Sequence, residues 1–237
     1  QTLEDVVAQI RGKEGTTVEI ELKTVAGEVK TVRVIRSDIK LETVAGEMKN
    51  NKIGYIRIGM FNENTGSDFI KKFHELEGQG MEGLVLDLRD NPGGLLGESV
   101  KVAELMVPKG PIVSVTERSG KSVTEYSSLE KVKYPVAVIV NQGSASAAEI
   151  VAGALQDTKA GKLFGTKTFG KGSVQAVSNL DESTGMKLTI ARYYTPSGRS
   201  INGTGIEPDV VIEPVGETGE NQLTEAISYL EKELAKK

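Results

Sequence analysis

Pro135-Val-Ala-Val-Ile-Val-Asn-Gln-Gly-Ser-Ala-Ser-Ala-Ala-Glu149 is the stretch of this sequence that decides the fold. Its first part is a short apolar run rich in β-branched residues, which predicts a buried strand over residues 136–140. The small residues that follow predict a sharp turn, and we expect a helix over residues 147–158. A strand, a turn and a helix in this order expose the hydroxyl of Ser146 beside free backbone N–H groups.

Strands and helices alternate on both sides of this stretch. Hydrophobic periodicity and turn residues predict strands over 52–58, 83–89 and 187–194, helices over 65–78, 95–107 and 221–237, and a hairpin of 111–116 with 121–126. This alternation indicates an α/β fold with a parallel or mixed sheet covered by helices. In such sheets the chemistry lies at the carboxyl ends of the strands. Residues 90–94 and 143–146 both occupy that position.

The N-terminal part is organised differently. Apolar residues at helical spacing predict a helix over residues 2–11, and alternating apolar residues predict strands over 17–23 and 29–35. One helix and two strands bury too little apolar surface for a domain with its own core. We therefore expect residues 1–28 to be the last part of a small module whose beginning is not in this sequence.

Composition excludes several function classes. The 237 residues are 38% hydrophobic and 26% charged, which is ordinary for a soluble globular protein. A net charge of −4 without a basic stripe gives no sign of nucleic-acid binding. No apolar run approaches the roughly 20 residues that span a membrane, and no signal peptide opens the sequence.

Catalytic bases are scarce in this chain. It has no cysteine, which excludes thiol catalysis and cysteine-rich metal sites. Its one histidine, His74, lies in a charged helical stretch, where we expect it on the helix surface. Ser146 therefore has no partner for a Ser-His-Asp triad. Lys171 lies between glycines in Thr168-Phe-Gly-Lys-Gly-Ser-Val-Gln175, and a lysine removed from water can be a general base near neutral pH.

The motifs of this chain resemble those of the C-terminal processing peptidases, also called tail-specific proteases, which use a Ser-Lys dyad. The motifs are Asp87-Leu-Arg-Asp-Asn-Pro-Gly-Gly-Leu95, Asn141-Gln-Gly-Ser-Ala-Ser-Ala-Ala-Glu-Ile150, Thr168-Phe-Gly-Lys-Gly-Ser-Val-Gln175 and Tyr194-Thr-Pro-Ser-Gly-Arg-Ser-Ile-Asn-Gly-Thr-Gly-Ile-Glu-Pro-Asp209. The likeness runs from about Leu3 to Val215. It implies a serine endopeptidase with a crotonase/ClpP-like α/β core, and it implies no metal or cofactor.

The resemblance also assigns the catalytic residues. It implies that Ser146, rather than Ser144, is the nucleophile, that Lys171 is the general base and that Gln175 orients the lysine amine. The sequence departs from the family pattern at two positions, where Ala148 replaces a serine and Thr166 replaces a glutamate. Neither change touches the dyad.

The oxyanion hole is expected to use backbone N–H groups. Ala147 directly follows the nucleophile at a helix start, and Gly93 lets a second backbone segment approach closely. Gly94 could take the place of Gly93. Asp157 matches a position that some family members require, and both a supporting role in catalysis and a role in fixing the fold stay open.

Asp87 and Arg89 lie at the end of a predicted strand. Charge-assisted hydrogen bonds between them could hold the loops of the site together. We interpret both residues as structural.

The resemblance also suggests an organisation into segments. Residues 1–28 correspond to the end of a PDZ domain, 29–50 to a connecting strand and linker, 51–215 to the protease core and 216–237 to a C-terminal amphipathic helix. Expected partners are proteins or peptides with accessible C-terminal tails, and a homo-oligomer through the terminal helices stays open. The family implies an extracytoplasmic location, in a bacterial periplasm or cell-envelope exterior.

Two other functions remain as alternatives. A crotonase-fold acyl-CoA enzyme would also use glycine amides to hold an oxyanion, but it leaves the pair of Ser146 and Lys171 unexplained. An inactive peptide-binding scaffold would fit the incomplete N-terminal module, but it also leaves that pair without a role.

Overall fold

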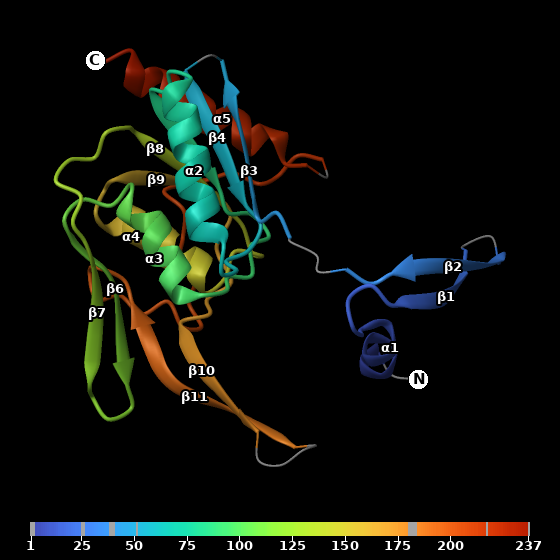
Figure 1. The fold of residues 1–237 in the computed structure, drawn as a ribbon. Coiled ribbons are helices and arrows are strands. Elements are labelled where there is room, and N and C mark those ends of the chain that lie inside the picture. The colour runs from blue at the N-terminus through green and yellow to red at the C-terminus, as the bar shows by residue number, and fades with distance from the viewer. Residues whose placement is uncertain are drawn as a thin grey trace. The chain divides into compact units, whose positions relative to one another are not determined.

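The structure is a computed structural model that describes residues 3–24, 27–37, 41–50, 52–179, 184–216 and 218–236. Its contacts divide the chain into two units, Gln1–Glu42 and Thr43–Lys237 (Figure 1). The expected segment boundary at residue 28 does not coincide with this division, because strand pairing joins the segments on its two sides.

The N-terminal unit is a helix and a β-hairpin. It consists of α1 (Leu3–Ile10), β1 (Thr17–Lys23) and β2 (Val29–Ile35), with β1 and β2 antiparallel along their whole length. The guanidinium of Arg36 donates hydrogen bonds to the backbone oxygens of Gln9 and Ile10 and so ties the end of α1 to the hairpin. Val29 and Ile35 remain 61% and 69% exposed, which agrees with the expectation that this unit has little core. Its interpretation as the end of a PDZ domain stays a prediction.

A six-stranded sheet forms the centre of the second unit, in the order β12-β9-β8-β5-β4-β3. Its strands are β3 (Val44–Lys49), β4 (Ile53–Ile58), β5 (Gly83–Asp87), β8 (Val136–Val140), β9 (Gly161–Gly165) and β12 (Val210–Val211). Only the pair of β3 and β4 is antiparallel among these strands. The sheet is therefore mixed, as expected.

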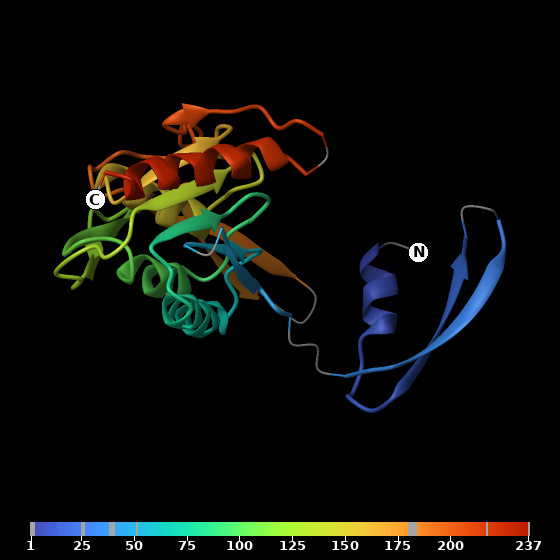
Figure 2. The same ribbon diagram turned by 90° about the horizontal axis from the view of Figure 1, so that it is seen from above.

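Helices cover both faces of this sheet. They are α2 (Thr65–Gly78), α3 (Leu96–Glu104), α4 (Ala147–Asp157) and α5 (Glu220–Leu234). Val136, Val138 and Val140 face a core shared with α2, α3 and α4, whereas Ala137 and Ile139 face a smaller core beneath α5. Figure 2 shows α5 on one side of the sheet and α2 and α3 on the other. Because both faces are covered, β8 reads as one continuous apolar run.

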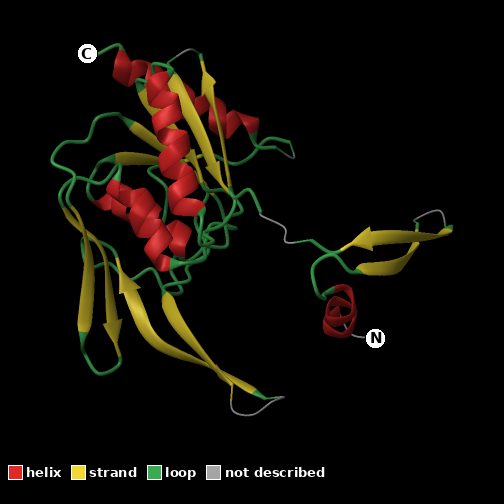
Figure 3. Cartoon of the chain, in the orientation of Figure 1, coloured by secondary structure: helices red, strands yellow, loops and turns green. Residues whose placement is uncertain are grey.

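A second, antiparallel sheet has the order β10-β11-β6-β7. Its strands are β6 (Gly110–Glu117), β7 (Ser122–Ser127), β10 (Ser173–Asn179) and β11 (Gly185–Tyr194). Figure 3 shows it as two long hairpins, and β11 pairs with β6 to join them. The second hairpin carries the predicted Lys171 segment at its start, so this sheet positions part of the candidate site.

Most predicted elements are confirmed, with ends that differ by a few residues. The strands β3, β9, β10 and β12 were not predicted from the sequence. Glycines begin and end β9, the alternation of polar and apolar residues in β10 breaks at Ala176-Val177, and β12 has two residues, so these three segments show no strong strand pattern. Within the described residues, none of the helices is both long and apolar enough to cross a membrane.

Candidate active site

Ser146 lies in a strained turn between β8 and α4. Its backbone has φ 55° and ψ −114°, a conformation that a residue with a side chain rarely adopts. Its side chain is 6% exposed. Gly93 packs directly against this turn, since a Cβ at Gly93 would lie 2.7 Å from Ser146 Cβ and 2.9 Å from Ala147 N. The missing side chain of Gly93 thus lets the loop after β5 reach the serine, as the sequence predicted.

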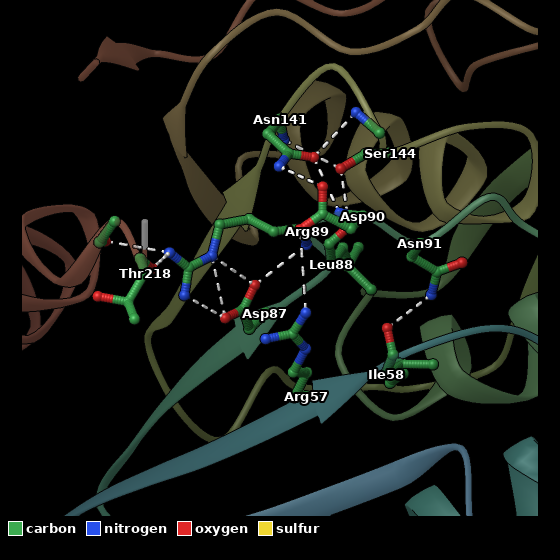
Figure 4. A network of polar contacts seen from close by, with 12 residues as sticks. Arg57, Ile58, Asp87, Leu88, Arg89, Asp90, Asn91, Asn141, Ser144 and Thr218 are labelled. Carbon is green, nitrogen blue, oxygen red and sulfur yellow. Dashed lines mark hydrogen bonds and ion pairs between the residues drawn. The ribbon is translucent and has the colours of Figure 1, made fainter. Parts of the chain in front are cut away.

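Ser144 is a structural residue of the same turn. It is fully buried, and its hydroxyl donates to the backbone oxygen of Leu88 at 2.7 Å and accepts from Asn141 N at 3.0 Å (Figure 4). Both hydrogen bonds lie inside the loops that follow β5 and β8. The hydroxyl of Ser144 therefore fixes the turn, which leaves Ser146 as the serine available for chemistry.

Glu149 connects the serine turn to the lysine segment. It lies in the first turn of α4 and is fully buried. Its carboxylate accepts the backbone N–H groups of Ser146, Gly170 and Lys171 at 2.8 to 2.9 Å, together with the hydroxyl of Thr168. One carboxylate thus holds the backbones of both predicted dyad residues.

Glu149 was not among the predicted site residues. A signal was nevertheless present, because a glutamate three residues after a serine at a helix start is the capping-box pattern. That pattern predicts the bond from Ser146 N to the Glu149 side chain. It does not predict the bonds from the lysine segment, which comes from a distant part of the chain.

The hydroxyl of the predicted nucleophile has a partner other than the predicted base in this structure. Within the described residues, no hydrogen bond joins Ser146 Oγ to Lys171 Nζ, and Ser146 Oγ instead lies 3.2 Å from the hydroxyl of Tyr193. Lys171 is partly buried. Tyr193 is 7% exposed and was not among the predicted site residues.

Gln175 follows Lys171 by four residues and lies in β10. It is an exposed residue of β10, next to an irregularity in the pairing with β11. No hydrogen bond between Gln175 and Lys171 occurs among the described residues. The orienting role of Gln175 stays a prediction.

The backbone N–H groups expected to form the oxyanion hole differ in whether they are already hydrogen-bonded. Among the described residues, neither Ala147 N nor Gly94 N donates a hydrogen bond within the protein. The N–H of Gly93, in contrast, donates to Asn91 Oδ1 at 2.8 Å. Ala147 and Gly94 therefore have their donors available in this state, whereas Gly93 would have to exchange Asn91 for a substrate oxygen.

A buried ion pair anchors the end of β5. Arg89 Nε donates to Asp87 Oδ1 at 2.9 Å, and Arg89 also donates to the backbone oxygens of Thr218 and Gly219 at the start of α5 (Figure 4). Hydrogen bonding to Asp87 raises the pKa of Arg89. Burial, with the nearby charge of Asp87, raises the pKa of Tyr55, whose hydroxyl donates to that carboxylate. These contacts fit the structural role that the sequence indicated.

Asn141 joins the loops that follow β5 and β8. Its Oδ1 accepts Asp90 N at 2.9 Å, and its Nδ2 donates to Asp90 Oδ1 at 2.9 Å. Asn91 adds a second connection, because its backbone oxygen accepts Ala145 N and its Nδ2 donates to the backbone oxygen of Ile58. The loop with the glycines is thereby fixed against the loop with Ser146.

Asp157 holds the turn that follows β11. Its carboxylate accepts the backbone N–H and the hydroxyl of Ser197, at 3.0 and 2.6 Å, and pairs with Arg199 at 2.8 Å. Burial raises the pKa of Asp157, but hydrogen bonds from Ser197 and Thr195 and the charge of Arg199 outweigh it, so the pKa lies below its usual value. The geometry supports the reading in which Asp157 fixes the fold.

His74 lies on the surface of α2, as expected. Its side chain is 58% exposed, and its Nδ1 is 2.6 Å from Glu77 Oε2 one turn away. It takes no part in the arrangement around Ser146.

Comparisons with known proteins find relatives over most of this chain. The family model described as Peptidase family S41 matches residues 52–212. The carboxyl-terminal-processing protease of Picosynechococcus sp. is 42% identical over 222 residues, which are 90% of this chain and 53% of that protein. The carboxy-terminal processing protease CtpA of Bacillus subtilis is 40% identical over 211 residues, 88% of this chain and 45% of that protein.

A solved structure shows the same likeness. The photosystem II D1 C-terminal processing protease matches with a TM-score of 0.67 and 34% identity, over 90% of this chain and 60% of that one. This chain spans about half the length of the curated relatives it matches. Neither an acyl-CoA enzyme nor an inactive scaffold is favoured by these comparisons.

Proposed function

We propose that this chain, which belongs to peptidase family S41, hydrolyses peptide bonds with Ser146 as nucleophile and Lys171 as general base. The observation that carries the proposal is the buried carboxylate of Glu149, which binds Ser146 N and Lys171 N at 2.9 Å each. This connection holds the backbones of the two predicted dyad residues against one buried group, which supports their use together in one reaction.

The reaction follows from the residues around Ser146. The neutral amine of Lys171 takes the hydroxyl proton of Ser146 while Oγ forms a bond to the carbonyl carbon of the substrate. Backbone N–H groups of Ala147 and of the glycine loop stabilise the oxyanion. When the C–N bond breaks, the proton on Lys171 goes to the leaving amine. A water molecule then hydrolyses the acyl-enzyme, and Oγ regains a proton.

Exposed apolar side chains next to the site favour extended or unfolded protein substrates. Phe169 is 67% exposed, and its backbone N–H bonds to the oxygen of Ser144. Leu95, which follows the glycine loop, is 48% exposed, and Met60 precedes the residue that pairs with this loop. We take C-terminal tails of proteins, met outside the cytoplasm, as the proposed substrates, since the relatives are named for C-terminal processing.

Covalent labelling tests the proposal. A fluorophosphonate should label the chain, and mass spectrometry should find the label on Ser146. Ser146→Ala and Lys171→Arg should both abolish labelling, because alanine has no nucleophile and a guanidinium does not accept a proton. Ser144→Ala is the matched control: it should lower stability and leave labelling of the folded protein. Labelling that persists in Ser146→Ala would overturn the proposal.

A further inference from the structure

Tyr193 connects the nucleophile with the lysine segment. It lies near the end of β11 with its side chain 7% exposed, and its Oη is 3.2 Å from Ser146 Oγ. Its backbone N–H donates to the oxygen of Gly172, the neighbour of Lys171, at 3.0 Å. One residue therefore contacts both segments that carry the dyad.

The residues around Tyr193 in β11 and in the turn after it fix its position. Ala191, Tyr193 and Thr195 are buried at alternating positions, so they share the inward face of this part of the chain. The turn that follows β11 is tied to α4 through Asp157, which binds both the backbone and the hydroxyl of Ser197. The tyrosine hydroxyl is thus presented to Ser146 by a rigid element.

The acceptors within reach of each hydroxyl decide the direction of the hydrogen bond between Tyr193 and Ser146. The distance between the two hydroxyls fits either direction. The proton of Tyr193 has Ser146 Oγ as its one acceptor within the described part of the chain, and a buried donor without an acceptor costs free energy. The proton of Ser146 is the one that Lys171 removes in the proposed reaction, so a hydrogen bond that Ser146 Oγ accepts leaves this proton free for transfer. Donation from Tyr193 to Ser146 therefore gives the buried tyrosine proton its acceptor.

We propose that Tyr193 is a positioning residue that donates a hydrogen bond to Ser146 Oγ and thereby directs the serine proton toward Lys171. The inference rests on the proposed role of Ser146 as nucleophile. When Lys171 takes the proton, negative charge develops on Oγ, and a hydrogen bond to a charged acceptor is stronger than one to a neutral hydroxyl. Tyr193 therefore accelerates acylation more than it affects binding.

The test is the kinetics of acylation by a fluorophosphonate, measured on the whole chain. Tyr193→Phe keeps the ring and removes only the hydroxyl. We expect the limiting rate of labelling to fall roughly tenfold to a hundredfold, while the concentration for half-maximal rate stays unchanged. Tyr194→Phe is the matched control, because it removes a hydroxyl from the next residue of β11 and should leave the rate unchanged. The thermal midpoint of Tyr193→Phe should match that of the unmodified chain.

The controls separate this inference from the proposed function. Labelling that persists in Ser146→Ala refutes Ser146 as nucleophile and with it the inference. If Ser146→Ala is unlabelled while Tyr193→Phe reacts at the original rate or faster, only the role of Tyr193 is overturned. A slower reaction that matches a loss of folded protein, measured by circular dichroism, overturns it as well.

Discussion

Replacing Glu149 with glutamine tests the connection between the serine turn and the lysine segment. The carboxylate accepts four hydrogen bonds, from the backbone N–H groups of Ser146, Gly170 and Lys171 and from the hydroxyl of Thr168. A glutamine of the same shape has one oxygen, and its NH₂ group is itself a donor. The donors that face this NH₂ group lose their acceptor, whichever way the amide is turned.

The size of the effect follows from those unpaired donors. Oε1 accepts from Thr168 and Gly170 and Oε2 from Ser146 and Lys171, so Glu149→Gln leaves two buried donors unpaired. Each unpaired buried donor costs about 1–3 kcal/mol, so the free energy of unfolding should fall by about 2–6 kcal/mol. For a chain of this size that corresponds to a fall of the thermal midpoint on the order of 10 °C.

The assay combines denaturant unfolding with fluorophosphonate labelling of the folded protein. A displacement of about 1 Å between catalytic groups can cost roughly a hundredfold in rate, so labelling of folded Glu149→Gln should slow by about that factor. Glu98→Gln is the matched control. Glu98 is also buried and accepts a backbone N–H, from Gly66 at 2.9 Å, but lies in α3 away from Ser146. The free energy of unfolding of Glu98→Gln should fall by about 1 kcal/mol, and its labelling rate should stay unchanged.

Two results would refute this reasoning. If Glu149→Gln keeps its free energy of unfolding, the four hydrogen bonds do not stabilise the fold as the distances suggest. If it loses stability but labels at the original rate, the carboxylate does not position Ser146 and Lys171 for reaction.

Three further outcomes are expected. Peptidase activity on a labelled unfolded protein should rise from neutral to alkaline pH, because only the neutral amine of Lys171 accepts a proton from Ser146. Gln175→Ala should shift or abolish that rise. Activity that does not change with pH would exclude lysine as the base. The lowered pKa of Asp157 should stabilise the fold above the pKa of the unfolded chain, about 3.9, and this stabilisation should be lost as pH falls through the folded pKa. Asp157→Asn should therefore flatten the dependence of unfolding free energy on pH below about 4, and an equally steep curve would contradict the assignment. Finally, calorimetry on residues 1–237 should show that a peptide with a free C-terminus binds less than about tenfold more tightly than its amidated form, a difference of ~1.4 kcal/mol. The reason is that the resemblance assigns to residues 1–28 only the end of a PDZ domain, without its carboxylate-binding loop. A larger difference in affinity would place a tail site within residues 1–237.

Much of the fold could be predicted from the sequence because it depends on the local pattern of apolar and polar residues. The run Val136–Val140 is buried on both faces, as its continuous apolar composition predicted. The strands with weak patterns were missed, because β10 and β12 are strands through their pairing with β11 and β9 rather than through their own composition. Tertiary context overrides weak strand propensity in such segments.

The sequence by itself determined which residues can do the chemistry. The absence of cysteine and the place of His74 disfavoured thiol and Ser-His-Asp chemistry, and the resemblance to C-terminal processing peptidases implied Ser146 and Lys171 as nucleophile and base. The strand before the serine placed it at a carboxyl end of the sheet. Only the tertiary structure decided what surrounds them. Glu149 and Tyr193 became part of the site through hydrogen bonds that reach 22 and 47 residues along the chain. Such contacts form only when distant segments pack together, and a local pattern carries no information about which buried hydroxyl or carboxylate will meet the serine.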